Sequence, residues 1–272
     1  MSRNQSRTKG TPPKAQVQPS PPEPPVSAFN FVVPTEVVDL PSKGQYYPEG
    51  HPLHGDDSIE IKHMTAKEED ILTSASLLKK GTALDKMLQS IIVDKRIKIE
   101  DLLIGDKNAL LVASRIYGYG ADYMTTVQCQ TCNETFENIY DLNELTFKEI
   151  EETGEVTKTE NNTFIIALPK SQFTVEFRLM TSRDESAISK VVSGGTLELL
   201  KTITVSINGQ VDHFYISQAL QTLPILDVSL YKRAYARIMP DIDMTQDVEC
   251  THCGDVAKMG VPLDAGFFWP EF

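Results

Sequence analysis

The sequence predicts an α+β fold in which two related halves are joined by a four-cysteine module and follow a disordered N-terminal tail. Three observations lead to this prediction: the spacing of the four cysteines, a series of motifs that occurs twice, and a proline-rich beginning. We expect the tail to cover residues 1–28, the first half 29–148 and the second half 149–272. A chain of 272 residues is long enough to bury a substantial hydrophobic core.

The cysteines occur as two pairs with the same spacing, Cys129 with Cys132 and Cys250 with Cys253. In a Cys-x-x-Cys pair, one tight turn can present two thiolates to the same metal ion. Both pairs are flanked by segments with strand character, namely 123–128, 135–140, 245–249 and 255–261. Two such knuckles facing each other form a zinc-ribbon-like module, so we predict one Zn2+ bound by all four cysteines. Four protein ligands leave no open position, which indicates a structural metal.

The cysteines also allow alternatives to a four-cysteine zinc site. Four buried free thiols, two disulfides or a redox-active Cys-x-x-Cys pair are the alternatives, and His252 could replace one thiolate as a ligand. The N-terminus does not resemble a secretory signal, and no apolar run reaches the roughly 18 residues of a membrane span. We therefore expect a reducing compartment, which favours zinc over disulfides.

The charge distribution argues against nucleic acid as a partner. The net charge is −12, although the first 26 residues contain four basic side chains and one acidic one. The remainder of the chain is therefore strongly acidic, whereas binding to phosphates requires a basic surface. The tail itself contains seven prolines and has little apolar surface to bury, so we expect it to be disordered.

The first half begins with strand signals. A short apolar run, Phe31 to Val33, ends at Pro34 and is expected to form an edge strand. Apolar and polar residues alternate from Ser58 to Met64, which predicts a second strand.

Helices are expected next. Thr65 and Glu68 have the spacing of a capping box, which predicts a helix to about Lys79, broken at Gly81 and followed by another over 83–92. Asp106 is expected to act as the N-cap of a further helix, which leads toward the strand before Cys129.

The same order of motifs returns after an acidic connector at 149–162. Leu168–Ser171 is similar to Leu40–Lys43, and Met180–Glu185 is similar to Met64–Glu69. Asp227 is expected to cap a helix as Asp106 does. Met180 lies 116 residues after Met64, and Cys250 lies 121 residues after Cys129. We infer a duplication of roughly 120 residues, with chance similarity of common capping boxes as the alternative.

A duplication gives the metal a specific role, because each half would contribute one knuckle. A structural zinc ion contributes about 10–16 kcal/mol, which is comparable to the roughly 5–15 kcal/mol that stabilises a whole domain. Loss of the metal should therefore separate or unfold the halves.

The C-terminus combines several aromatic residues, including Phe267, Phe268 and Trp269. So much apolar surface should not remain in water. Either these side chains fold back onto the cysteine module, or they dock into a neighbouring subunit.

No catalytic motif is recognisable in the sequence. A Walker loop, a dinucleotide fingerprint, a nucleophile elbow and a paired-histidine zinc-hydrolase motif are all missing. We therefore predict a protein that is not an enzyme, with no catalytic residues and no organic cofactor.

Four features together resemble the baseplate hub proteins of T-even-like contractile-tailed bacteriophages. They are the segment Val38–Tyr47, the Met-Thr-x-x-Glu-Glu step at Met64, the two knuckles, and the Phe-Phe-Trp-Pro ending. The resemblance covers about residues 30–272. It implies a non-enzymatic virion protein of the tail baseplate hub, or a protein needed for tail assembly, with other baseplate and tail proteins as partners. It also implies a location in the host cytoplasm during assembly and then in the tail baseplate. An assembly chaperone that is absent from the virion and a nucleic-acid-binding zinc-ribbon regulator are the alternatives; no membrane partner is expected.

Overall fold

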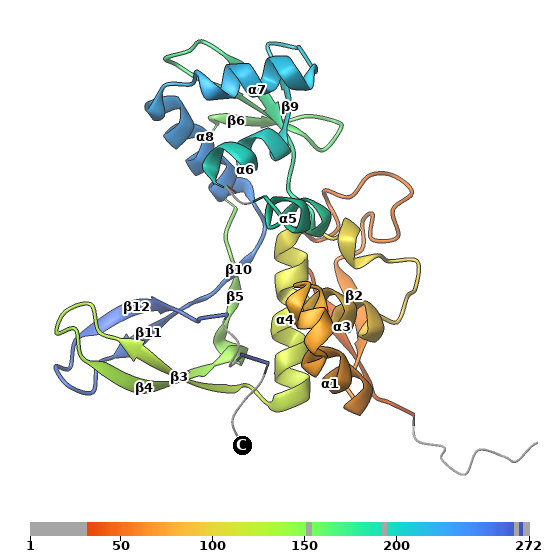
Figure 1. Ribbon diagram of the computed structural model, residues 1–272, viewed down its shortest axis with the longest axis vertical. Coiled ribbons are helices and arrows are strands. Elements are labelled where there is room, and N and C mark those ends of the chain that lie inside the picture. Colours follow the sequence, from red (N-terminus) through yellow and green to blue (C-terminus); the bar gives the residue numbers. More distant parts are fainter. Residues whose placement is uncertain (1–31, 151–153, 192–194, 264–266, 269–272) are drawn as a thin grey trace, which may run out of the picture. The chain divides into compact units, whose positions relative to one another are not determined.

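The computed structural model describes residues 32–150, 154–191, 195–263 and 267–268. The expected disordered tail at 1–28 and the side chain of Trp269 lie outside these residues. The described part is a mixture of helices and small antiparallel sheets, as predicted. Figure 1 shows their arrangement. No helix in these ranges is both long enough and apolar enough to cross a membrane.

The first half forms a small sheet covered by helices. In chain order its elements are β1 (Thr35–Asp39), β2 (Ser58–Lys62), α1 (Ala66–Thr73), α2 (Ala75–Lys79), α3 (Ala83–Ile91), η1 (Ile99–Asp101) and α4 (Ile104–Tyr119). β1 and β2 pair in antiparallel register, and Ile92 continues the sheet through a bridge to Ile61. The predicted capping box is confirmed, because the Glu68 carboxylate accepts hydrogen bonds from the backbone N–H and hydroxyl of Thr65.

The cysteine module consists of two antiparallel hairpins. Its strands are β3 (Asp122–Gln128), β4 (Thr135–Asp141), β11 (Thr245–Glu249) and β12 (Val256–Gly260). All four match the predicted strands to within one residue at either end. After β4 the chain continues through η2 (Leu142–Glu144) to β5 (Thr146–Phe147), which pairs with β10 (Ile242–Asp243). The chain leaves the module through β5 and returns to it through β10 (Figure 1).

The second half contains a four-stranded antiparallel sheet and four helices. The strands are β6 (Val156–Lys158), β7 (Phe164–Ala167), β8 (Thr174–Phe177) and β9 (Thr204–Ile207). The helices are α5 (Ser182–Ile188), α6 (Thr196–Ile203), α7 (His213–Gln221) and α8 (Ile225–Ile238). Phe177 and Tyr231 are fully buried at the centre of this half, with ring centroids 5.1 Å apart. Burial of each such side chain stabilises the fold by about 1.5–3 kcal/mol.

Two predictions about element ends are wrong. The first strand begins after Pro34 and not before it, because the described residues Val32 and Val33 form no strand. Neither Asp106 nor Asp227 is an N-cap: the cap positions are Leu103 and Pro224, and each aspartate is the third residue of its helix. Both aspartates are fully buried, where their carboxylates accept hydrogen bonds from a distant loop.

Candidate metal centre and the second joint between the halves

The four cysteines lie in two turns of identical construction. In the first, the Cys129 N–H donates to the Glu134 carbonyl at 2.9 Å, and the Asn133 N–H donates to the Cys129 carbonyl at 3.0 Å. The second turn repeats both bonds, from Cys250 to Asp255 at 2.8 Å and from Gly254 to Cys250 at 2.9 Å. Asn133 and Gly254 both have positive φ, 61° and 69°, a conformation that asparagine and glycine tolerate. The local sequence therefore explains why each turn presents its two thiols together.

The two turns bring all four sulfur atoms within 4.8 Å of one another. Two sulfur–sulfur distances between the hairpins are 3.7 Å, from Cys129 Sγ to Cys253 Sγ and from Cys132 Sγ to Cys250 Sγ. A tetrahedral site with metal–sulfur distances of about 2.3 Å has sulfur–sulfur distances of about 3.8 Å. Disulfides would require about 2.05 Å, and all four cysteines are free. The donor set and its spacing therefore fit one tetrahedral thiolate-bound ion.

The thiolate form is favoured at Cys129, whereas the pKa values of Cys132 and Cys253 are raised because their backbone hydrogen bonds are outweighed by burial and the neighbouring thiols. The backbone N–H groups of Cys132 and Thr131 lower the pKa of the Cys129 thiol to about 7. Only thiolates bind metal strongly, so a lower pKa favours binding at neutral pH. The Thr131 hydroxyl also donates to Asp255 at 2.6 Å, which ties the two turns together beside the sulfurs. His252 is exposed and is not part of the cluster.

Aromatic residues from the C-terminal segment pack beneath the hairpins. Phe267 and Phe268 are buried, and the Phe267 ring contacts Tyr123 with centroids 5.2 Å apart. Of the two predictions for this segment, the fold-back therefore holds for both phenylalanines. Docking of these two side chains into a neighbouring subunit is wrong in this structure, because both rings are already covered by the chain itself.

A second contact region between the halves lies at α5. This helix follows β8 in sequence but packs against η1 and α4 of the first half. The Ser182 N–H donates to the Leu102 carbonyl at 2.8 Å, and the Ile104 N–H donates to the Met180 carbonyl at 3.2 Å. The buried Lys107 ammonium pairs with Asp85 of the first half and with Glu185 of α5.

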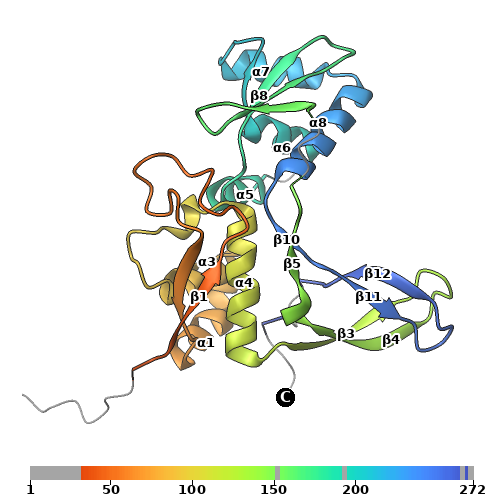
Figure 2. The same ribbon diagram turned by 180° about the vertical axis from the view of Figure 1, so that it is seen from behind.

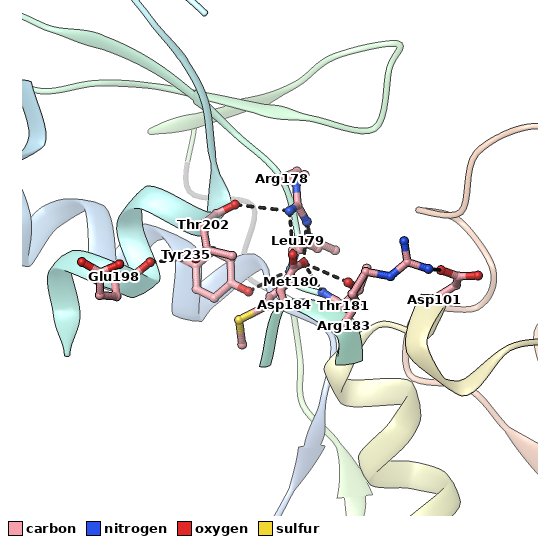
Figure 3. Close-up of polar contacts among 10 residues, drawn as sticks. All are labelled: Asp101, Arg178, Leu179, Met180, Thr181, Arg183, Asp184, Glu198, Thr202 and Tyr235. Carbon is pink, nitrogen blue, oxygen red and sulfur yellow. Dashed lines mark hydrogen bonds and ion pairs between the residues drawn. The ribbon is translucent and has the colours of Figure 1, made fainter. Parts of the chain in front are cut away.

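Figure 3 shows how the chain is held immediately before and at the start of α5. Arg178 makes a bidentate ion pair with Asp184 at 2.7 and 2.9 Å and also donates to the Thr202 carbonyl. The bond to Asp184 raises the pKa of Arg178, so the pair remains charged. Asp184 completes the second predicted capping box with Thr181, which the structure confirms.

On the other side of the same segment, Arg183 reaches the first half and pairs with Asp101 at 2.7 Å (Figure 3). The stretch from Arg178 to Asp184 is therefore anchored to both halves. Sequence reasoning identified its capping box but not its position between the halves, because the contacts with Asp101 and Leu102 join residues about 80 positions apart.

The two buried aspartates occupy matching places. Asp106 accepts from the backbone N–H and hydroxyl of Ser42 at 2.9 and 2.6 Å, and from the Tyr47 hydroxyl at 2.6 Å. Asp227 accepts from the backbone N–H groups of Lys170 and Ser171 at 3.1 and 2.7 Å. In each half, the Leu-Pro loop after a strand is thus bonded to the first turn of the last long helix.

The pKa values of these two carboxyl groups are shifted in opposite directions. Burial raises the pKa of Asp106 above its ordinary value, despite the hydrogen bonds from Ser42 and Tyr47. Burial also acts to raise the pKa of Asp227, but the hydrogen bonds from Ser171 and Lys170 outweigh it and lower the pKa. Hydrogen bonds to the charged form therefore outweigh burial at Asp227 but not at Asp106.

The fold and the site define an α+β protein with a four-cysteine cluster between two hairpins. A family model described as T4 bacteriophage base plate protein matches residues 33–265. The chain therefore belongs to the T4 bacteriophage base plate protein family, which confirms the resemblance noted in the sequence. This membership implies other baseplate and tail proteins as partners. Neither the curated proteins nor the solved structures contain a match to this chain.

Proposed function

We propose that this chain is a non-enzymatic structural or assembly component of the phage tail baseplate hub, in which one zinc ion joins two duplicated halves. The observation that carries the proposal is the convergence of four thiols, from hairpins more than 100 residues apart, in a baseplate family member. We place the protein in the host cytoplasm during assembly and in the tail baseplate afterwards.

The choice of zinc follows from the donor atoms and their spacing. Four soft thiolate ligands in a tetrahedral arrangement suit Zn2+ better than harder divalent cations. Two cysteine side chains are almost fully buried, Cys129 and Cys250, each 2% exposed. A closed, partly buried set of thiolates supports a structural ion, with Cys129, Cys132, Cys250 and Cys253 as its ligands.

The proposed duplication is supported by five features that follow in the same order in each half. They are a strand, a Leu-Pro loop, a second strand, a helix that begins with a threonine capping box, and a long helix whose third residue is a buried aspartate. Each series then ends in one of the two equivalent cysteine turns. Chance similarity of capping boxes does not account for the matching aspartate–loop contacts.

Metal analysis of the purified full-length chain tests the zinc part of the proposal. We expect one zinc per chain by elemental analysis, and release of zinc when the thiols are modified with a mercurial reagent. A chain that is folded but binds no zinc, under reducing conditions with zinc supplied, would contradict this part.

Mass spectrometry of purified virions tests the structural role. We expect peptides of this chain in the virion, in a stoichiometric amount relative to other baseplate proteins. If the chain is present in infected cells but missing from virions, the alternative of a tail-assembly chaperone replaces the structural role.

The nucleic-acid-binding regulator remains the alternative from another class. The four strands of the module carry five acidic side chains and a single basic one, Lys258. Such a surface repels phosphate groups. Salt-dependent retention of the chain on DNA or RNA would favour the regulator, and we expect no retention.

A further inference from the structure

The strand β1 has an edge that no other described strand covers. The Leu40 N–H donates to the Asp57 carbonyl at 2.7 Å, and the His63 N–H donates to the Pro34 carbonyl at 3.0 Å. Because backbone hydrogen bonds alternate along an antiparallel pair, the even-numbered residues of β1 bond to β2. The backbone N–H and C=O groups of Val37 therefore point away from β2, toward the open edge.

The corresponding edge in the second half is occupied. Matching Leu40 with Leu168 makes Ile165 of β7 the counterpart of Val37 in β1. Ile165 lies opposite Thr157 of β6, and Thr157 is in the alternating position that exchanges hydrogen bonds with it. The second half thus contains a covering strand at the place where the described first half has none.

A groove of about 350 Å3 with both polar and apolar surface lies beside the open edge of β1. Its walls include Val37, Val112, Ala113, Ile116 and Phe147, from β1, α4 and β5. Figure 2 shows β1 next to α4, which forms one wall. Val37 is 64% exposed and Phe147 is 40% exposed. The edge carries the charged residues Glu36 and Asp39, but the exposed Val37 and Phe147 beside it indicate an interaction surface.

We infer that the edge of β1 and this groove bind an extended segment of a neighbouring protein, which adds to β1 as an antiparallel strand. The segment has apolar side chains that fill the groove and a Lys or Arg near Asp39, which also lines it. The strand β6 provides the template, since it covers the equivalent edge with the sequence Val-Thr-Lys. Strand addition of this type obtains affinity from main-chain hydrogen bonds and specificity from side-chain pockets. That the neighbour is a baseplate protein rests on the proposed function.

The test uses substitutions that affect only the open edge or the groove. Val37→Pro removes the outward N–H and leaves the bonds of Glu36 and Val38 to β2, in a position where edge strands tolerate proline. Val37→Thr retains the N–H and is the matched control. Ala113→Leu adds volume at a largely buried position of the groove wall and serves as a second variant if Val37→Pro unfolds, provided that its own unfolding curve matches that of the parent chain.

The probe is an array of overlapping short peptides covering the other baseplate and tail proteins of the same phage, with the full-length chain in solution. We expect at least one peptide with alternating apolar and basic residues to bind the parent chain and Val37→Thr equally. Its binding to Val37→Pro and to Ala113→Leu should be weaker by at least about tenfold.

Three results would overturn the inference: no peptide binds, all variants bind equally, or binding occurs only after deletion of residues 1–31. The last result would assign the edge to the chain's own terminus. The proposed function is tested separately by the virion analysis. A chain that is found in virions but binds no peptide disproves only the docking surface.

Discussion

The two halves share several features in the same order, but they differ in how their sheets and loops are completed. In the second half, β6 covers β7, and the Leu-Pro loop reaches the next strand within a few residues. In the first half β1 has no described covering strand, and residues 40–57 form a long loop before β2. The bonds between the loop and the buried aspartate recur in both halves, whereas the covering strand and the long loop with its buried Tyr47 and Leu53 do not.

The largest expected effect is on metal binding, to which the two cysteine pairs should contribute equally. Cys129→Ser and Cys250→Ser each remove one of four ligands from a site whose ion contributes about 10–16 kcal/mol. We expect both variants to lose zinc and to become protease-sensitive in the two hairpins, to the same extent. Elemental analysis and limited proteolysis measure this, with His252→Ala as a control that retains zinc. Loss of zinc from only one of the two serine variants would show that the cysteine pairs are not equivalent.

The next largest effect is on stability, and it should differ between the two buried aspartates. Asp227→Asn leaves the backbone N–H of Lys170 or Ser171 facing an amide donor at the fully buried side chain, so we expect a loss of about 2–3 kcal/mol in the free energy of unfolding. Asp106→Asn should cost only about 1 kcal/mol, because the hydroxyls of Ser42 and Tyr47 can rotate and accept from the new amide. Denaturant unfolding at neutral pH measures both. Equal costs would mean that the type of donor does not matter here.

The contributions of Asp106 and Asp227 to stability should have opposite pH dependence. The lowered pKa of Asp227 means that its carboxylate stabilises the fold above its unfolded pKa, and that this contribution is lost as the pH falls through the folded pKa. The raised pKa of Asp106 gives a contribution that is present below its unfolded pKa and is lost as the pH rises. Between pH of about 3 and 7, we therefore expect the cost of Asp227→Asn to increase with pH and that of Asp106→Asn to decrease. Unfolding curves at several pH values measure the two slopes, and slopes of the same sign would contradict this.

The smallest effect concerns the two capping boxes. Thr65→Ala and Thr181→Ala should each cost about 1 kcal/mol, because each removes a hydroxyl that bonds to the first turn of its helix. Thr181→Ala should in addition increase hydrogen exchange in α5, which lies between the halves. Thr65→Ala should change exchange only in α1. Serine at either position keeps the hydroxyl and is the control; increased exchange in α5 from Thr65→Ala would contradict the local role of that box.

Local signals in the sequence predicted the local parts of the structure. The hairpin strands and both capping boxes follow from residue spacing within a few positions, and the structure confirms them. The convergence of the cysteines could be predicted because paired spacing implies a shared ion.

Long-range contacts could not be predicted in this way. Asp106 has the sequence signature of a helix cap, but its partners are Ser42 and Tyr47, 64 and 59 residues earlier. The three-residue strand β6 lies in a segment that reads as an acidic connector. The position of α5 depends on carboxylate and carbonyl groups of the first half. The pattern of residues within α5 does not identify these partners.

The separation of the two cysteine turns has a consequence for synthesis of the protein. When the ribosome has made Cys129 and Cys132, about 120 further residues must be added before Cys250 and Cys253 emerge, which takes on the order of ten seconds. A nascent or prematurely terminated product holds only half of the ligands. Closure of the site therefore reports that translation has passed Cys253.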